Sequence, residues 1–174
     1  MTAFATPSIR SSAAANSFET WRVRVRFPPL GAVGLGVVDI IDRHFAAENA
    51  HDVEGTLATY TEDIVWDDVT HPDAPFRGKE EVGAVYSSII DAIPDVRLES
   101  VRRFSAEDGK YVVDESILSG HVEGEWSGME GGGAPVRVRI LHIFELRDGL
   151  ISYENAWFDA AAVQRQIHAW HESR

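Results

Sequence analysis

The stretch VRVRILHIFELRDGLISYENAWF, residues 136–158, decides the fold because it reads as two strands joined by a tight turn. Its segment 147–149, Arg-Asp-Gly, ends in glycine, which suits a three-residue hairpin loop whose last position needs a positive φ. In that register His142 faces Glu154 across the hairpin. A two-residue turn would instead place Asn155 opposite His142. The face that carries the pair is otherwise mostly apolar: Val138, Ile140, Phe144 and Leu146 against Leu150, Ser152, Ala156 and Phe158.

Two ionisable side chains on an apolar face need an explanation, because a buried charge is costly unless it is paired. One interpretation is that His142 and Glu154 satisfy each other as a structural couple. The other is that they line a cavity in which a substrate meets them. The sequence leaves both interpretations open.

The composition limits the class of protein. The chain has 174 residues, of which 44% are hydrophobic, enough for one well-filled domain. It has no cysteine, which excludes disulfides and thiolate catalysis and favours a reducing, cytoplasmic compartment. A net charge of −12 argues against nucleic acid as a partner. The longest apolar run, residues 30–38, falls short of the roughly 20 residues of a membrane span, so we expect no membrane partner.

Residues 1–34 differ from the rest in composition. They hold Arg10, Arg22, Arg24 and Arg26 against one acid, Glu19. We expect an accessory or disordered segment over 1–34 and a folded domain over 35–174. An Arg- and Ser-rich start with few acids is also typical of a transit peptide, or it could come from an upstream start codon. Alternation over residues 21–27 would suit a short strand.

Beyond residue 34 the hydrophobic spacing becomes regular. Apolar residues at helical spacing predict helices over 35–48 and 79–93, the second ended by Pro94. Asp52 and Asp159 are expected to cap a short helix through Tyr60 and a last helix ending near Trp170. Strands are expected at 64–69, 96–104, 111–126, 136–147 and 150–158. This order predicts an α+β fold, in which a curved antiparallel sheet forms a cone that about three helices close, leaving a cavity.

The order of elements, together with three motifs, is similar to that of a known family. These are GHVEGEWSG at 120–128, Arg-Asp-Gly at 147–149 and Trp-Phe-Asp at 157–159. Over roughly residues 35–170 the chain resembles the SnoaL-like polyketide cyclases of the nuclear transport factor 2-like superfamily. The resemblance implies a hydrophobic pocket, no cofactor, and a homodimer through the outer sheet face. One departure is Gly-Gly-Gly-Ala-Pro at 131–135, where relatives usually carry a Pro-Thr-Gly-like segment, at the expected rim of the cavity mouth.

A more distant resemblance, to the ketosteroid isomerases, places three residues in that pocket. Residues 38–52 resemble their first helix, with His44 at the position of their oxyanion-binding tyrosine. Trp66-Asp67-Asp68 resembles the strand of their general base, which corresponds to Asp68. His142 corresponds to their aspartic acid that donates a hydrogen bond. Because two of the three residue types differ, the resemblance implies the same cavity but not the same reaction.

Each of these residues has a plainer interpretation. His44, on an apolar helix face, is either a pocket residue or a hydrogen-bonded core histidine. Asp68 shares strand parity with Trp66, which directs its carboxylate inward, unless it belongs to the turn that follows. An aspartate that the cyclases and the limonene epoxide hydrolases need on their last strand falls near Ala156, so Glu154 would have to replace it.

The sequence therefore predicts a small cofactor-free enzyme, of the intramolecular aldol cyclase or isomerase type, that acts on a hydrophobic carbonyl compound. Asp68 or Glu154 would be the base, and His142 or His44 the donor to the enolate oxygen. Expected contacts to the substrate come from His44, Trp66, Phe144, Ala156 and Phe158.

Two other functions compete with this one. A non-catalytic carrier would bind a small apolar ligand in the same cone. An epoxide hydrolase is weakened as an alternative, because Glu115 and Ile117 stand near the positions where those enzymes carry Arg and Asp. Metal-ligand types also occur at Asp67, Asp68, His71 and Asp73, but they span a Pro-rich turn, and we predict no metal.

Overall fold

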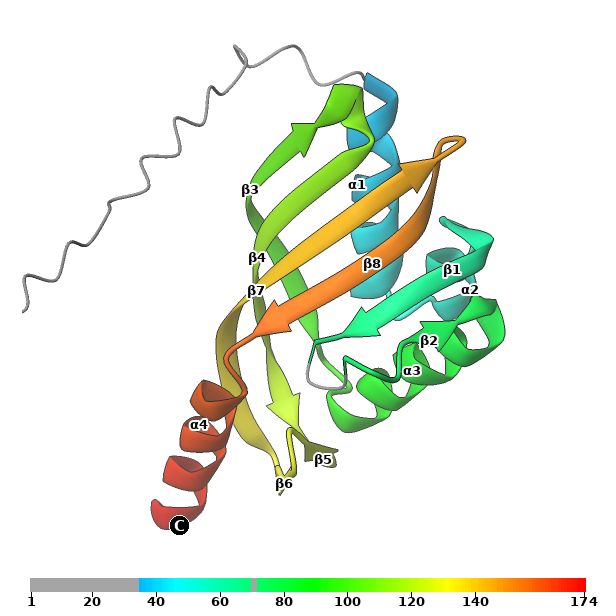
Figure 1. The fold of residues 1–174 in the computed structure, drawn as a ribbon. Helices are drawn as coiled ribbons and strands as arrows, with labels where there is room; N and C mark the ends of the chain where they lie inside the picture. The colour runs from blue at the N-terminus through cyan, green and yellow to red at the C-terminus, as the bar shows by residue number, and fades with distance from the viewer. Residues whose placement is uncertain (1–34, 70–71) are drawn as a thin grey trace, which may run out of the picture. The chain divides into compact units, whose positions relative to one another are not determined.

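The computed structural model describes residues 35–69 and 72–174 (Figure 1). Residues 1–34, where we expected an accessory or disordered segment and a strand at 21–27, and His71 lie outside the described residues. The helices are α1 (Leu35–Asn49), α2 (Val53–Leu57), α3 (Gly78–Ala92) and α4 (Ala160–Glu172), with a 3-10 turn η1 (Glu107–Gly109). The strands are β1 (Tyr60–Asp68), β2 (Phe76–Arg77), β3 (Arg97–Ala106), β4 (Tyr111–Val122), β5 (Glu125–Trp126), β6 (Met129–Glu130), β7 (Ala134–Arg147) and β8 (Leu150–Phe158).

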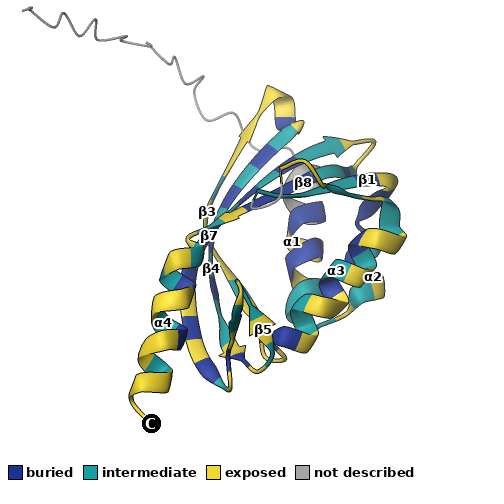
Figure 2. Ribbon diagram, turned by 60° about the horizontal axis from the view of Figure 1, so that its bottom comes forward, coloured by how far each residue is buried: buried dark blue, intermediate teal, exposed yellow. Residues whose placement is uncertain are grey.

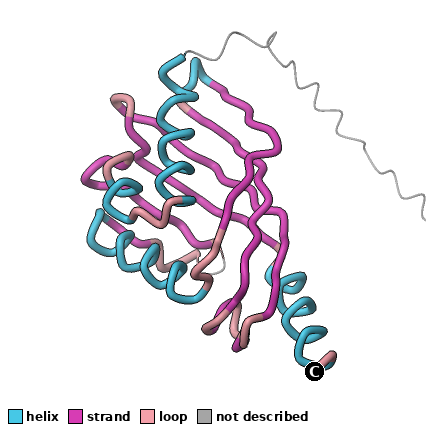
Figure 3. Tube along the Cα trace, turned by 180° about the vertical axis from the view of Figure 1, so that it is seen from behind, coloured by secondary structure: helices cyan, strands magenta, loops and turns pink. Residues whose placement is uncertain are grey.

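Six strands form the main sheet in the order β2-β1-β8-β7-β4-β3. All neighbours are antiparallel except β1 and β8, which run parallel. The sheet is curved, and α1, α2 and α3 cover one of its faces. The last helix, α4, lies apart from these three and packs against β7 (Figures 1 and 3). This confirms the predicted α+β cone, with one difference. The sheet is not wholly antiparallel, because β8 pairs with β1 in the parallel direction.

Local signals set most of the element ends. The Asp52 side chain accepts a hydrogen bond from the Gly55 N–H at 2.9 Å and caps α2. Asp159 caps α4 in the same way through Ala162, also at 2.9 Å. α3 ends at Ala92, two residues before the proline that cannot continue it. The expected extension of the second helix through Tyr60 is wrong, because the chain is already extended there and begins β1.

The hairpin between β7 and β8 corrects our predicted register. Arg147 pairs with Leu150, so the loop has two residues, and both Asp148 (φ 54°) and Gly149 (φ 80°) have positive φ, as a type I′ turn requires. A bulge then leaves Ser152 unpaired on β8. His142 therefore lies opposite Ala156, not Glu154.

The bulge returns Glu154, Ala156 and Phe158 to the predicted inner face, whereas Ile151 takes the inward place expected for Leu150 and Ser152. A two-residue turn alone would send Glu154 outward, but the extra residue reverses the parity once more. Glu154 pairs with Phe144, one row away from His142, and both ionisable side chains are buried on the inner side of the sheet.

Two groups of buried apolar side chains form the core. One joins α4 to the C-terminal end of β4 and the N-terminal end of β7, and includes Val122, Val136, Val163 and Ile167. The other packs α1 and α3 on the sheet. Figure 2 shows the buried positions following the strands and the sheet-facing side of α1 and α3. Partly buried Trp66 and Leu98 contact both groups, so the space between the groups is the place for a cavity. No helix in the described ranges is long and apolar enough to cross a membrane.

Candidate functional site

A cavity of about 440 Å³ lies between the inner sheet face, α2, α3 and the C-terminal end of α1. Its wall is mainly apolar, as is usual for small-molecule sites. The apolar and aromatic lining residues are Val53, Trp66, Phe76, Ala84, Val85, Tyr86, Ile89, Ile90, Val96, Leu98, Leu118, Trp126, Ile140, Ala156 and Phe158. The polar ones are Glu48, Asn49, His51, Asp52, Thr56, Asp68, Glu81, Ser88, His142 and Glu154.

Three lining residues form one row across the sheet. Asp68 on β1 pairs with Ala156 on β8, and Ala156 pairs with His142 on β7. Paired residues of adjacent strands point to the same face, and neighbouring strands lie about 4.8 Å apart. The backbones of Asp68 and His142 are therefore separated by about 10 Å, with only a methyl group between them. Because the Ala156 side chain is short, the cavity extends over it between Asp68 and His142.

The next row holds Trp66, Glu154 and Phe144. Trp66 and Glu154 line the cavity, and so does Phe158 from the end of β8. Two residues expected to contact a substrate do not line it. Phe144 is fully buried, and so is His44; their rings pack edge to face with centroids 5.7 Å apart. Both belong to the layer behind the wall.

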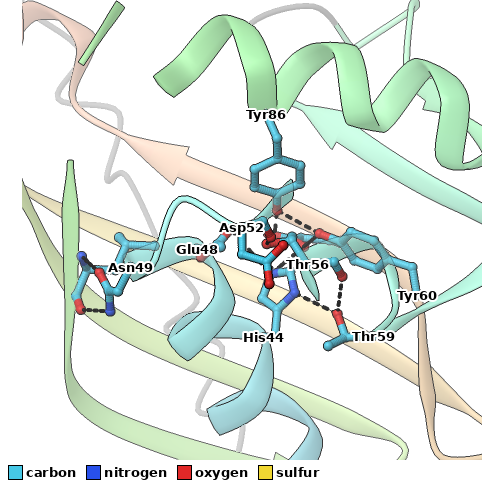
Figure 4. A network of polar contacts seen from close by, with 10 residues as sticks. His44, Glu48, Asn49, Asp52, Thr56, Thr59, Tyr60 and Tyr86 are labelled. Atoms are coloured by element: carbon cyan, nitrogen blue, oxygen red, sulfur yellow. Dashed lines mark hydrogen bonds and ion pairs between the residues drawn. The ribbon is translucent and has the colours of Figure 1, made fainter. Parts of the chain in front are cut away.

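His44 lies at the centre of a buried polar network (Figure 4). Its Nδ1 is 2.9 Å from Thr59 Oγ1, and that hydroxyl donates to the Thr56 carbonyl at 2.6 Å. Since the Thr59 hydrogen is used there, the Thr59 oxygen accepts from His44 Nδ1–H. The other ring nitrogen, Nε2, lies 3.3 Å from Glu48 Oε1 and 3.4 Å from Glu154 Oε2. One imidazole thus faces two carboxylates.

The two carboxylates fix the charge of His44. Burial by itself lowers the pKa of the imidazole, but Glu48 and Glu154 outweigh burial and raise that pKa to about 10. For Glu154, burial acts to raise the pKa of the carboxyl, while His44, His142 and Tyr60 together bring it below its usual value. At neutral pH the centre of the domain therefore holds an imidazolium and an ionised Glu154.

Two tyrosines complete the network. Tyr60 donates a hydrogen bond to Glu154 Oε2, and its hydroxyl oxygen is 2.7 Å from that of Tyr86. Each hydroxyl also lies 3.4 Å from His44 Nε2. Burial, followed by the charge of Glu154, raises the pKa of both phenols well above their usual range, so both stay neutral hydrogen-bond donors.

Glu48, Tyr60 and Tyr86 were not nominated from the sequence. A signal existed for Glu48, because it lies four residues after His44 on the apolar face of α1, where an acid needs a partner. No signal existed for the two tyrosines. A tyrosine at an inward position of a strand or helix reads as an ordinary core residue, and only the fold brings these two hydroxyls together.

Three buried polar atoms on the cavity wall lack a hydrogen-bond partner within the described part of the chain. They are His142 Nδ1, Trp66 Nε1 and Glu48 Oε2. Buried polar groups in native proteins are nearly always bonded. Trp66 Nε1–H is a donor only and Glu48 Oε2 an acceptor, while His142 Nδ1 can serve in either role.

The glycine-rich segment 131–135 does not rim the cavity, contrary to our expectation. None of its residues is among the described residues of the cavity wall. It folds back on the end of β4, where a Cβ on Gly131 would lie 1.9 Å from the Val122 carbonyl oxygen. Trp126, stacked on Phe158 with centroids 5.3 Å apart, lines the cavity at this end instead.

The positions relevant to an epoxide hydrolase face away from the cavity. Glu115 lies on the outer side of β4 and pairs with Arg102 and Arg139. The buried residue beside it, Asp114, accepts from Arg103 Nε at 2.8 Å and does not line the cavity.

Metal-ligand types are close together in one place among the described residues. Ligand atoms of His44, Glu48 and Glu154 lie within 4.8 Å of one another. In the network described above, His44 acts as a cation toward both carboxylates. Of the metal-ligand types noted in the sequence at residues 67–73, Asp67 accepts from Tyr153 at 2.7 Å and from Asn155 at 3.1 Å.

Residues 41–154 match the model of the SnoaL-like domain family. The match spans well over half of the chain. The chain belongs to this family. No curated protein matches it.

Solved structures share the fold of this SnoaL-like protein. One is assigned as a SnoaL-like polyketide cyclase from Jannaschia sp. CCS1, with a TM-score of 0.70, 19% identity, and coverage of 81% of this chain and 97% of that one. Another is assigned as a polyketide cyclase from Xanthomonas campestris pv. campestris (TM-score 0.69, 17% identity, 76% and 96% covered). A third, from Catenulispora acidiphila, is a hypothetical protein with a ketosteroid isomerase-like fold in complex with trimethylamine (TM-score 0.64, 18% identity, 75% and 92% covered).

Proposed function

We propose that this protein is a cyclase or isomerase that moves a proton next to the carbonyl group of a hydrophobic molecule held in the cavity. The observation that carries the proposal is the row Asp68–Ala156–His142, where a carboxylate and an imidazole line one space from either side of a small residue. Membership of the SnoaL-like family and a fold shared with proteins assigned as polyketide cyclases support this class.

The chemistry needs a base and a donor in defined places. Removing a proton from the carbon next to a carbonyl places negative charge on the carbonyl oxygen, which must receive hydrogen bonds. Asp68 is the proposed base. His142 Nδ1, buried and without a partner among the described residues, is the proposed donor. Trp66 Nε1–H, also unsatisfied in the described structure, is a second donor for the same oxygen or for another on the substrate.

Glu154 is the weaker candidate for the base. It forms an ion pair with His44 and accepts a hydrogen bond from Tyr60, and its lowered pKa makes its carboxylate a poorer proton acceptor. We assign it a positioning role: its charge fixes the His44 network, which forms the wall behind the substrate.

Both reactions of the class use the same first step. Asp68 takes a proton from carbon, the C–H electron pair enters the carbonyl system, and an enolate forms. In an isomerisation the proton returns to another carbon of the enolate. In an aldol cyclisation the enolate carbon forms a bond to a second carbonyl carbon of the same molecule, and the oxygen of that carbonyl receives the proton.

Deuterium exchange tests this first step without the natural substrate. The probe is 2-tetralone, an apolar ketone, in D₂O with the full chain, and NMR follows the loss of its α-protons. We expect exchange faster than in buffer, and a loss of about 10²–10⁴-fold in the Asp68→Asn variant with ketone affinity nearly unchanged. His142→Phe should also slow exchange.

A matched control is Glu81→Gln, which removes another carboxylate of the cavity wall and should leave the exchange rate unchanged. If the wild type binds the ketone but exchanges its protons no faster than buffer does, the protein is a carrier and the proposal is wrong.

A further inference from the structure

Carboxylates outnumber the basic side chains on the cavity wall, where the only basic residues of the described chain are His51 and His142. Five carboxylates line it, those of Glu48, Asp52, Asp68, Glu81 and Glu154, and no lysine or arginine of the described chain does. A site for a carboxylate or phosphate normally supplies such cations, because bidentate and charge-assisted hydrogen bonds hold the anion. This wall therefore disfavours an anionic ligand.

The shortage of cations is clearest at Glu48. The single imidazole of His44 faces both Glu48 and Glu154, so two carboxyl groups share it. The Glu48 side chain is 10% exposed, and its Oε2 has no partner among the described residues. A buried carboxylate oxygen without a donor is costly.

Two further features favour a cation at this place. Glu48 lies in the last turn of α1, which contains no basic residue, and the negative end of the helix dipole is located there. The rings of Tyr86 and Trp66 line the same cavity, and the Tyr86 hydroxyl is 3.4 Å from His44 Nε2, next to the carboxylate pair. Aromatic faces attract ammonium groups, most strongly where water is excluded.

We infer that the cavity takes an apolar molecule that bears a basic amine, with its ammonium group beside the Glu48 carboxylate and its apolar body against the aromatic wall. The inference rests on the proposed function and names its substrate class, a hydrophobic carbonyl compound with an amino group. The charge of the ligand would also assist the reaction. An enolate formed near five carboxylates, with no lysine or arginine on the described wall, is stabilised by a cation that the substrate itself carries.

Calorimetric titration of the full chain at pH 7 tests the inference with three probes of equal shape. They are 2-naphthylmethylamine, which is a cation, 2-naphthylmethanol, which is neutral, and 2-naphthoate, which is an anion. We expect the amine to bind at least 10-fold more tightly than the alcohol, and the naphthoate more weakly than both. Glu48→Gln should reduce the affinity for the amine to that for the alcohol and leave the alcohol unchanged. Glu80→Gln is the matched control, because Glu80 lies in the first turn of α3 outside the cavity wall; it should keep the order of affinities.

An amine that binds the wild type no more tightly than the alcohol, whether or not either binds, overturns the inference. So does a preference for the amine that survives in a folded Glu48→Gln variant. The order of affinities in the wild type needs no variant, so the test holds even if Glu48→Gln fails to fold. These titrations are independent of turnover. Proton exchange without amine preference would overturn this inference alone, and amine preference without proton exchange would overturn the proposed function.

Discussion

His44 Nε2 lies 3.4 Å from Glu154 Oε2 in the middle of the domain, and neither side chain has appreciable contact with water. The pair joins α1, the first described helix, to β8, the last strand. Glu154 lines the cavity while His44 stands behind it. One ion pair therefore holds α1 against the sheet and sets the charge on one part of the cavity wall.

The first prediction follows from the burial of this pair. His44→Leu leaves Glu154 and Glu48 without their cation and should lower the free energy of unfolding by about 3–5 kcal/mol, measured by urea denaturation. The double variant His44→Leu/Glu154→Leu should recover part of this loss, because it leaves fewer buried charges unpaired. A double variant less stable than His44→Leu would contradict this account.

His142 offers a contrast on the same sheet face. Its Nδ1 has no partner within the described residues, so His142→Gln removes no hydrogen bond from that atom. We expect a change in unfolding free energy of less than about 1 kcal/mol together with slower proton exchange in the ketone assay. A loss as large as that of His44→Leu would show that His142 is a structural residue.

A third prediction concerns the hydroxyl that orients the His44 ring. Thr59→Val keeps the shape but removes the acceptor for Nδ1–H, which leaves a buried donor unsatisfied. The expected cost is about 1–3 kcal/mol in unfolding free energy. Ser87→Ala is the control, because the Ser87 hydroxyl bonds only the Gly83 carbonyl on an exposed part of α3; its effect should stay within about 0.5 kcal/mol.

Much of the fold could be predicted because its signals are local. Helical spacing, the two aspartate caps and the proline after α3 depend on residues a few positions apart, and each is confirmed. Strand parity was confirmed along β7 and from Glu154 to Phe158, so this part of the inner face was identified, but the parity was wrong at Leu150. The register of the hairpin was not identified. Asp-Gly allows loops of two or three residues, and nothing in the alternation marks the bulge at Ser152.

The site was less predictable because its contacts are long-range. The inward directions of His44 and Glu154 could be read from the sequence. The sequence did not reveal that α1 places His44 beside Glu154, or that Glu154 lies one row away from His142. Electrostatics depends on such distances. The charge of His44 comes from two carboxylates, one a helical turn away and the other on the last strand.

The expected homodimer remains a proposal, and it gives a fourth prediction. On the outer sheet face Trp157 is 51% exposed and lies opposite Leu141 on β7, an apolar pair that a second copy would bury. Light scattering should give the mass of a dimer, and Trp157→Glu should give a folded monomer. Arg165→Glu, on α4, should leave the dimer intact. A monomeric wild type would rule out this interface.

The last prediction is a pH dependence caused by His44. The pKa of its imidazole is about 10 in the fold against an ordinary value of 6.5. A group whose folded pKa is raised binds its proton more tightly in the native state, so its contribution to stability is complete below pH 6.5 and is lost between pH 6.5 and about 10. The contribution of Glu154 to stability depends on pH in the opposite direction. Because its folded pKa is lowered, its contribution is present above its ordinary value of 4.5 and is lost as the pH falls below it.

Urea denaturation of the wild type and of His44→Leu/Glu154→Leu, from pH 5.5 to 10, isolates the His44 contribution. Over this range Glu154 is ionised in both the folded and the unfolded state, so it adds no slope, and other titrating groups are common to both proteins. The stability difference between the two proteins should be largest near pH 5.5–6.5 and fall steadily toward pH 10. A difference that stays constant across this range would mean that His44 is neutral in the fold, and its role as the cation between Glu48 and Glu154 would then be wrong.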